Sequence, residues 1–255
     1  MKKRKFDYSR LYYPTPKEKR GFYISANFIK VSIFVLIIGG LGYFIFLSPF
    51  FSLRNVFFEG EPTDELKLDL DNYKGKNVLL VSQENIRENL NKKYTIYKNI
   101  DIYKGLPDSI KVILYKRTRS FIWQTQSGAY SVDEDGVIYE KISSIPADNQ
   151  SPIVTDNKSL PAQLGQKIVV GDFIQFVNEV SAKFNEKTKM KISQIGVEET
   201  TYHLHIKTDA GFMVMLDTMR NLDDQLEDLG LIHSKYGSDI KEYVDLRIAG
   251  RAYYK

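Results

Sequence analysis

The chain has 255 residues, of which 43% are hydrophobic, 13% aromatic and 27% charged, so it can bury at least one core and is not disordered throughout. It contains no cysteine, which excludes disulfides, thiol nucleophiles and cysteine-ligated zinc sites. Only three histidines are present, which argues against a histidine-rich metal centre.

The net charge of +4 is unevenly distributed along the chain. Residues 1–30 contain nine lysines or arginines and two acidic residues, a net charge of +7, and the remainder carries a net charge of −3. A nucleic-acid-binding domain needs its positive charge on the folded surface. The distribution therefore argues against a nucleic-acid partner and predicts a basic tail over residues 1–27.

An apolar segment follows the tail, with no charged residue from Val31 to Leu53. A helix that begins near Phe28 and ends at Leu47 would span roughly 30 Å, the thickness of a bilayer core. A cleavable signal peptide is the alternative, but the apolar run exceeds the usual core of roughly 7–15 residues and no small-x-small cleavage site follows it. We therefore expect residues 28–50 to form an uncleaved transmembrane helix.

The charges on either side of this segment predict its orientation. Residues 48–67 contain two basic and four acidic residues, whereas the cations cluster before the segment. By the positive-inside rule, the N-terminus is cytoplasmic and the rest of the chain is extracytoplasmic. The sequence thus predicts a single-pass protein of the cytoplasmic (inner) membrane.

The first exported block, residues 51–117, shows the order strand, helix, helix, strand, strand. Thr63 and Ser82 are placed to cap its two helices. Two strands are expected at residues 96–104 and 109–116, joined by a turn that contains a Pro-Asp pair.

The second block, residues 118–255, reads as a mixed β domain with flanking helices. An Asp135-Gly136 pair between alternating apolar residues indicates a hairpin, and the polar, proline-containing stretch 143–159 is expected to be a loop. Asp217 is expected to cap the second helix. The remaining expected elements are strands at 121–125, 130–132, 137–139, 191–197, 202–208 and 212–216, and helices at 171–187 and after Asp217.

A search for catalytic and metal-binding motifs finds no convincing site. His203 and His205 would share one face of a strand, as two metal ligands must, but no third ligand is nearby and a solvated face is the simpler interpretation. The run 133–136 resembles part of a calcium loop without its distal glutamate, so the hairpin interpretation is favoured. P-loop, GxSxG and HExxH patterns do not occur. We therefore expect no enzymatic activity, no cofactor and no small-molecule substrate.

The last part of the sequence alternates with a period of two. From residue 243 to residue 255 every charge falls on an odd position, whereas Val244, Leu246 and Ile248 occupy the even ones. This pattern predicts one strand running from Tyr243 towards Tyr254 with a buried even face and an open odd face. Two interpretations remain: an ordinary closing strand of the sheet, or an edge that recruits a partner strand.

The order and spacing of several segments resemble those of the FtsQ/DivIB family of bacterial cell-division proteins. One departure is Lys116-Arg117-Thr118-Arg119, where the family has a segment similar to Glu-Arg-x-Pro. The matching segments are Phe51-Ser52-Leu53-Arg54-Asn55-Val56, Gly75-x-Asn77-Val78-Leu79, Leu106-Pro107-Asp108-Ser109-Ile110-Lys111-Val112, the stretch 130–139 and Tyr243-Val244-Asp245-Leu246-Arg247.

The resemblance implies an α+β fold: a single transmembrane helix, a POTRA-like β-α-α-β-β domain over 51–117 and a larger mixed β domain over 118–255. It also implies a non-enzymatic scaffold at the division septum that binds FtsB- and FtsL-like proteins. Carried over by position, the partner-binding residues are Arg247, Ile248, Ala249, Gly250, Arg251, Ala252 and Tyr253. The alternatives are a POTRA-type envelope protein that handles polypeptides and an anchored extracytoplasmic enzyme.

Overall fold

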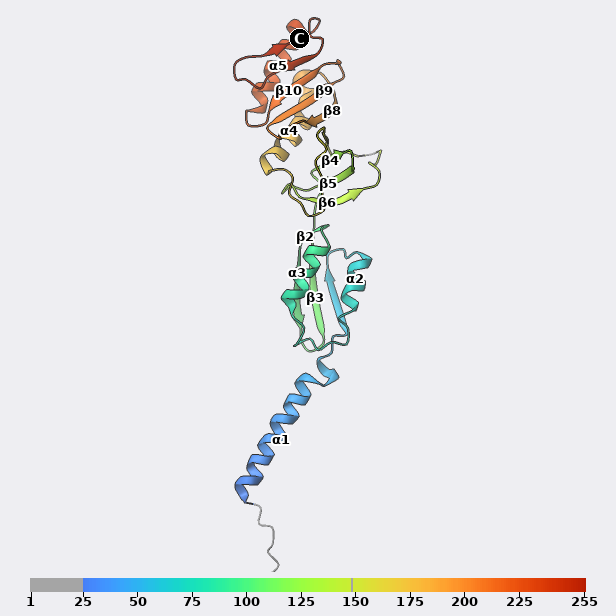
Figure 1. Cartoon of the computed structure of the whole chain (residues 1–255), viewed down its shortest axis with the longest axis vertical. Helices are drawn as coiled ribbons and strands as arrows, with labels where there is room; N and C mark the ends of the chain where they lie inside the picture. Colours follow the sequence, from blue (N-terminus) through green and yellow to red (C-terminus); the bar gives the residue numbers. More distant parts are fainter. Residues whose placement is uncertain (1–24, 148) are drawn as a thin grey trace, which may run out of the picture. The chain divides into compact units, whose positions relative to one another are not determined.

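A computed structural model of the chain describes residues 25–147 and 149–255 (Figure 1). The expected basic tail, residues 1–27, therefore lies almost wholly outside the described residues. Contacts divide the chain after Phe50 into two units, and each unit is described by itself below.

The first unit contains one long apolar helix, α1 (Ala26–Phe46). The Ser25 hydroxyl caps it by accepting a hydrogen bond from the Phe28 amide at 3.2 Å. None of its side chains is buried, and the span Ala26–Phe51 has a mean hydropathy of 2.3. Helix α1 is long and apolar enough to cross a membrane. Its apolar side chains cover every face of the helix and are not buried against the rest of the chain.

The second unit begins with a three-stranded sheet whose strand order is β1-β3-β2. It is built from β1 (Asn55–Glu59), α2 (Asp64–Asp71), α3 (Gln83–Lys93), β2 (Tyr97–Gly105) and β3 (Ser109–Lys116). Strand β1 pairs in parallel with β3, and β2 pairs with β3 in the antiparallel sense. The predicted order of strand, helix, helix, strand, strand is confirmed.

Local capping and hydrophobic burial explain why this segment folds as it does. The hydroxyls of Thr63 and Ser82 accept hydrogen bonds from the Leu66 and Asn85 amides, each at 3.3 Å, and so begin α2 and α3. The helices and the sheet enclose a cluster of buried side chains that includes Leu66, Leu70, Ile86, Leu90, Ile100, Ile102, Ile110 and Val112.

The rest of the second unit is a nine-stranded mixed sheet with two helices (Figure 1). Its strand order is β12-β11-β10-β9-β8-β7-β4-β5-β6. The elements are β4 (Phe121–Thr125), β5 (Gly128–Val132), β6 (Ile138–Ile142), β7 (Ile153–Asp156), α4 (Gly171–Thr188), β8 (Ile192–Val197), β9 (His203–Thr208), β10 (Met213–Asp217), α5 (Leu222–Tyr236), β11 (Tyr243–Asp245) and β12 (Tyr253–Tyr254).

A second buried cluster holds this sheet and its helices together. Alternate residues of β9 and β10, such as Leu204 and Val214, are fully buried on one face of the sheet. On α4 the residues at helical spacing are buried as expected: Phe173, Val177, Val180 and Phe184. The α+β fold class, with one apolar helix before the sheets, is thereby confirmed.

Two expectations for this part of the chain are wrong. The stretch 143–159 contains a strand, β7, which lies inside the sheet and pairs in parallel with both β4 and β8. Four residues are too few to show an alternating pattern, so the sequence hides this strand. Helix α5 is capped by Asn221 rather than Asp217, because the Asn221 side chain accepts from the Asp224 amide.

The single terminal strand expected from Tyr243 towards Tyr254 is also wrong. Strand β11 ends at Asp245, and the chain turns back as β12, which pairs antiparallel with β11. Gly250 adopts a φ of +68°, and the Arg251 amide donates to the Ile248 carbonyl at 3.2 Å within this reversal. The buried even face therefore stops at Leu246, and Ile248 is 52% exposed.

Candidate partner-binding site

The short strand β12 forms one edge of the nine-stranded sheet, and β11 is its only strand neighbour among the described residues. Tyr243 and Lys255 exchange backbone hydrogen bonds of 3.1 and 3.4 Å, so they form a hydrogen-bonded pair. Backbone groups alternate in direction along an antiparallel pair. The amide and carbonyl of Tyr254 therefore point away from β11, towards the open edge. Ala252 precedes β12, and the same alternation carried on to it would turn its amide and carbonyl outward as well.

Several contacts hold this edge in place. The Lys241 and Glu242 amides donate to the Lys255 carbonyl oxygen at 2.7 and 2.6 Å. The Tyr254 ring stacks on Tyr236 of α5, with centroids 5.6 Å apart and planes 21° from parallel. An edge anchored in this way loses little conformational freedom when a further strand pairs with it.

Arg247 is engaged in a local ion pair with Asp245. Its Nε and Nη2 atoms donate to the two carboxylate oxygens at 2.8 and 2.6 Å. This contact lowers the pKa of Asp245 below its ordinary value, despite the opposing effect of burial. Since the side chain is only 32% exposed, Arg247 shapes the end of β11 more than it presents a free charge.

The other residues predicted to bind a partner lie on the connection and on β12 itself. Ala249, Gly250, Arg251 and Ala252 are exposed. Three apolar side chains are also unusually open, with exposed fractions of 52% for Ile248, 46% for Tyr253 and 42% for Tyr254. Exposed tyrosines and a nearby arginine are typical of protein-binding surfaces.

Sequence reasoning missed Tyr254 and its partner Tyr236. The predicted single strand places Tyr254 on the buried face, and nothing in the local sequence points to a residue on α5. Gly250 was the one feature of the sequence that indicated the reversal of the chain, because a glycine between two short strand-like segments is typical of a hairpin.

The two histidines on β9 show no metal-binding geometry. In the part of the chain that the structure describes, no group of three or more His, Cys, Asp or Glu residues could hold an ion. The His205 side chain is only 10% exposed and lies 3.5 Å from the Glu198 carboxylate, measured from Nδ1. That nitrogen has no hydrogen-bond partner among the described residues.

Burial lowers the pKa of His205 below its ordinary value. Glu198 and Asp245 oppose this shift, and Arg247 and His203 reinforce it. The unfolded chain therefore takes up a proton near pH 6.5 more readily than the folded chain does. Folded-state stability contributed by neutral His205 is present above that pH and is lost as the pH falls.

We expect the melting temperature of the full chain to fall between about pH 7.5 and pH 5.5, and the fall to be shallower in His205→Gln. His203→Gln, an exposed position on the same strand, is the matched control and should retain the native slope. Thermal melting across this range checks the prediction. Equal slopes in the native chain and His205→Gln would contradict it.

Comparisons with known proteins agree with this architecture. The model of the family described as "Cell division protein FtsQ/DivIB, C-terminal" matches residues 121–247, from the first residue of β4 to just beyond β11. The cell division protein DivIB of Clostridium acetobutylicum is 23% identical over 213 residues, which cover 81% of this chain and 83% of the relative. The cell division protein FtsQ of Chloroflexus aurantiacus is 26% identical over 92 residues, 36% of this chain and 33% of the relative.

Among the described residues, one apolar helix that is long enough to cross a membrane precedes an α+β body, and this arrangement fits a single-pass membrane protein. The chain belongs to the FtsQ/DivIB family of cell division proteins.

Proposed function

We propose that the chain is a bitopic, non-enzymatic scaffold that links early and late division proteins at the septum by binding FtsB- and FtsL-type partners. The single observation that carries the proposal is the anchored, open edge of β12 in a chain of this family. An extended segment of a partner would pair with the outward backbone groups of Ala252 and Tyr254, and so continue the sheet.

Side chains around the edge would select the partner. Ile248, Tyr253 and Tyr254 offer apolar surface that a partner strand would cover. Arg251 is exposed and supplies a positive charge beside the edge, which favours an acidic residue on the partner. Arg247 would act indirectly, by holding Asp245 at the end of β11.

We also propose that the chain consists of a membrane anchor and two extracytoplasmic domains. Residues 28–50 anchor it, residues 51–117 form the POTRA-like domain, and residues 118–255 form the β domain. Two separate buried clusters, one between Leu53 and Leu114 and one between Phe121 and Leu246, support this division. The N-terminal cations favour a cytoplasmic N-terminus and extracytoplasmic domains.

We expect a fluorescent protein fused to the N-terminus of the full chain to form a band at midcell in dividing cells, because a septal scaffold must gather where its partners are. A fusion carrying only residues 1–54 is the control and should label the whole envelope. Fluorescence microscopy of the two fusions checks the prediction. A uniform envelope distribution of the full chain would instead favour the polypeptide-handling alternative.

A further inference from the structure

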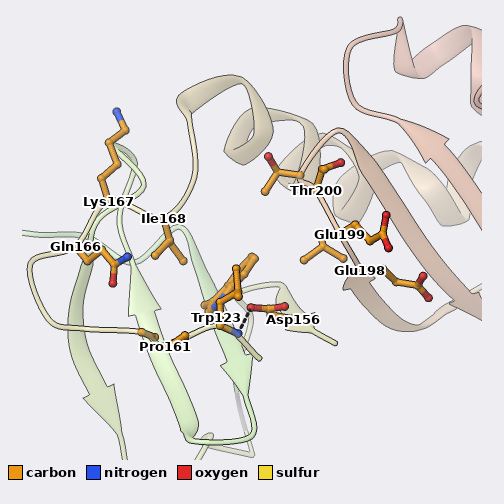
Figure 2. A pocket seen from close by; sticks show the side chains of 13 residues that line it. Trp123, Asp156, Pro161, Gln166, Lys167, Ile168, Glu198, Glu199 and Thr200 are labelled. Carbon is orange, nitrogen blue, oxygen red and sulfur yellow. Dashed lines mark hydrogen bonds between the residues drawn. The ribbon is translucent and has the colours of Figure 1, made fainter. Parts of the chain in front are cut away.

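A small cavity lies in the β domain, away from the β12 edge. The ends of β4, β7 and β8 line it together with the segment 160–168 and the turn 198–201. Figure 2 shows the Trp123 side chain between Ile168 and Asp156, with Glu198 and Glu199 on the turn that follows β8. The volume, about 190 Å³, is below the roughly 300–1,000 Å³ of small-molecule sites, so the cavity suits a single side chain.

The wall of this cavity contains a buried carboxylate. Asp156 is 4% exposed and accepts hydrogen bonds from the Lys158 and Ser159 amides through Oδ1, at 3.0 and 3.1 Å. Its Oδ2 accepts from the Leu160 amide at 3.1 Å. Within residues 25–147 and 149–255 it forms no ion pair. A carboxylate buried without a cation favours the arrival of one.

Two of the three charged side chains at the rim are acidic, Glu198 and Glu199, and the third is Lys167. Glu198 and Glu199 are exposed, and the nearest cation to Glu199 is Lys158 at 3.8 Å. Glu198 faces His205, whose neutral form offers no compensating charge. Lys167 also lines the cavity, but its side chain extends away from Trp123 and the acidic residues (Figure 2).

Apolar side chains form part of the remaining wall. Leu160, Pro161 and Ile168 surround the indole of Trp123, which is itself 6% exposed and packs edge-on against Phe121. Apolar walls suit an aliphatic stem, and an indole face attracts a cation. Among cationic side chains, arginine is the better fit, because its planar guanidinium can stack on the indole and donate to carboxylates at the same time.

We propose that this cavity is a socket for one arginine side chain of a partner polypeptide. The guanidinium would lie over Trp123 and donate towards Asp156 and Glu198, with its stem along Leu160 and Ile168. The socket is separate from the β12 edge, so it would add a second point of contact for a partner.

The chain contains one tryptophan, so an indole probe reports on this cavity alone. We would replace Trp123 by fluorotryptophan in the full chain in lipid nanodiscs and follow its fluorine NMR signal. The probes are N-acetyl-arginine methylamide, its lysine and leucine counterparts, and free arginine. The expected result is a saturable shift with the blocked arginine, about fivefold weaker affinity for the blocked lysine, and no saturable shift with the blocked leucine.

Charge removal at the rim provides the second arm of the test. The double substitution Glu198→Gln with Glu199→Gln should weaken binding of the blocked arginine about threefold or more, because both carboxylates attract the cation. Glu186→Gln, an exposed position on α4, is the matched control and should leave the affinity unchanged.

Three results would overturn the proposal. One is the absence of a saturable shift up to about 50 mM of the blocked arginine, far above the millimolar range expected for one side chain. Another is equal binding of the blocked leucine, which would make the cavity a purely apolar socket. The third is tighter binding of free arginine, which would make it a site for the amino acid itself.

Discussion

Replacing Leu246 by aspartate should unfold the C-terminal part of the nine-stranded sheet, at a cost of more than about 4 kcal/mol. The Leu246 side chain is 2% exposed and belongs to the buried cluster shared by the sheet and its helices. Its amide donates to the Met215 carbonyl at 3.0 Å, so the side chain cannot turn outward without breaking the end of the sheet. Urea unfolding followed by the emission of the single tryptophan, Trp123, measures the loss.

The same substitution two residues later provides a matched control. Ile248 is 52% exposed on the connection after β11, and Ile248→Asp should change the free energy of unfolding by no more than about 0.5 kcal/mol. Equal destabilisation by the two variants would mean that the buried alternation continues past Leu246 and that the terminal hairpin is wrong.

A second large effect is expected at Arg117. Its guanidinium pairs with Asp133, and the two side chains are only 14% and 1% exposed. The Arg117 Nε also donates to the Thr95 carbonyl at 3.1 Å. Arg117→Met leaves the Asp133 carboxylate buried without its cation, which should destabilise the folded chain by about 3–5 kcal/mol. The same urea titration measures this loss.

An exposed ion pair tests whether burial is the cause. Lys111 lies 2.7 Å from Glu59, with both side chains more than half exposed. Lys111→Met should cost no more than about 1 kcal/mol, since solvent screens such pairs. A loss for Arg117→Met as small as that for Lys111→Met would contradict the buried ion pair.

The features that could be predicted from the sequence depend mostly on residues close together in the chain. Thr63 and Ser82 cap helices as expected because an N-cap needs only its own side chain and an amide three residues later. The apolar stripe of α4 is equally local, since its buried residues repeat at helical spacing.

The failures concern features that depend on distant parts of the chain. Strand β7 exists because β4 and β8 flank it on both sides, and its four residues show no pattern of their own. The terminal hairpin depends on one glycine with positive φ and on the stacking of Tyr254 against α5. Asp133 was assigned correctly to a hairpin, where it accepts from the Asp135 and Val137 amides, but its ion pair with Arg117 could not be foreseen.

The candidate site also combines features set by neighbouring residues with features set by distant parts of the chain. The alternation after Tyr243 and the family resemblance pointed to residues 247–253 as the candidate site, but they did not predict that the chain reverses direction there. Since β12 turns back on β11, the outward backbone groups within β12 belong to Tyr254, one residue beyond the predicted segment 247–253. A partner strand would therefore pair further along the chain than the sequence suggests.

The most direct test of the proposed scaffold is the affinity of the full chain in nanodiscs for the FtsB-type protein of the same organism, measured for Ala252→Pro and Ala252→Ser. Proline removes the outward amide at an exposed edge position, and serine retains it. We expect about tenfold weaker binding for Ala252→Pro, with native binding for Ala252→Ser and unchanged melting temperatures for both. Native affinity of a folded Ala252→Pro variant would contradict partner binding at the β12 edge.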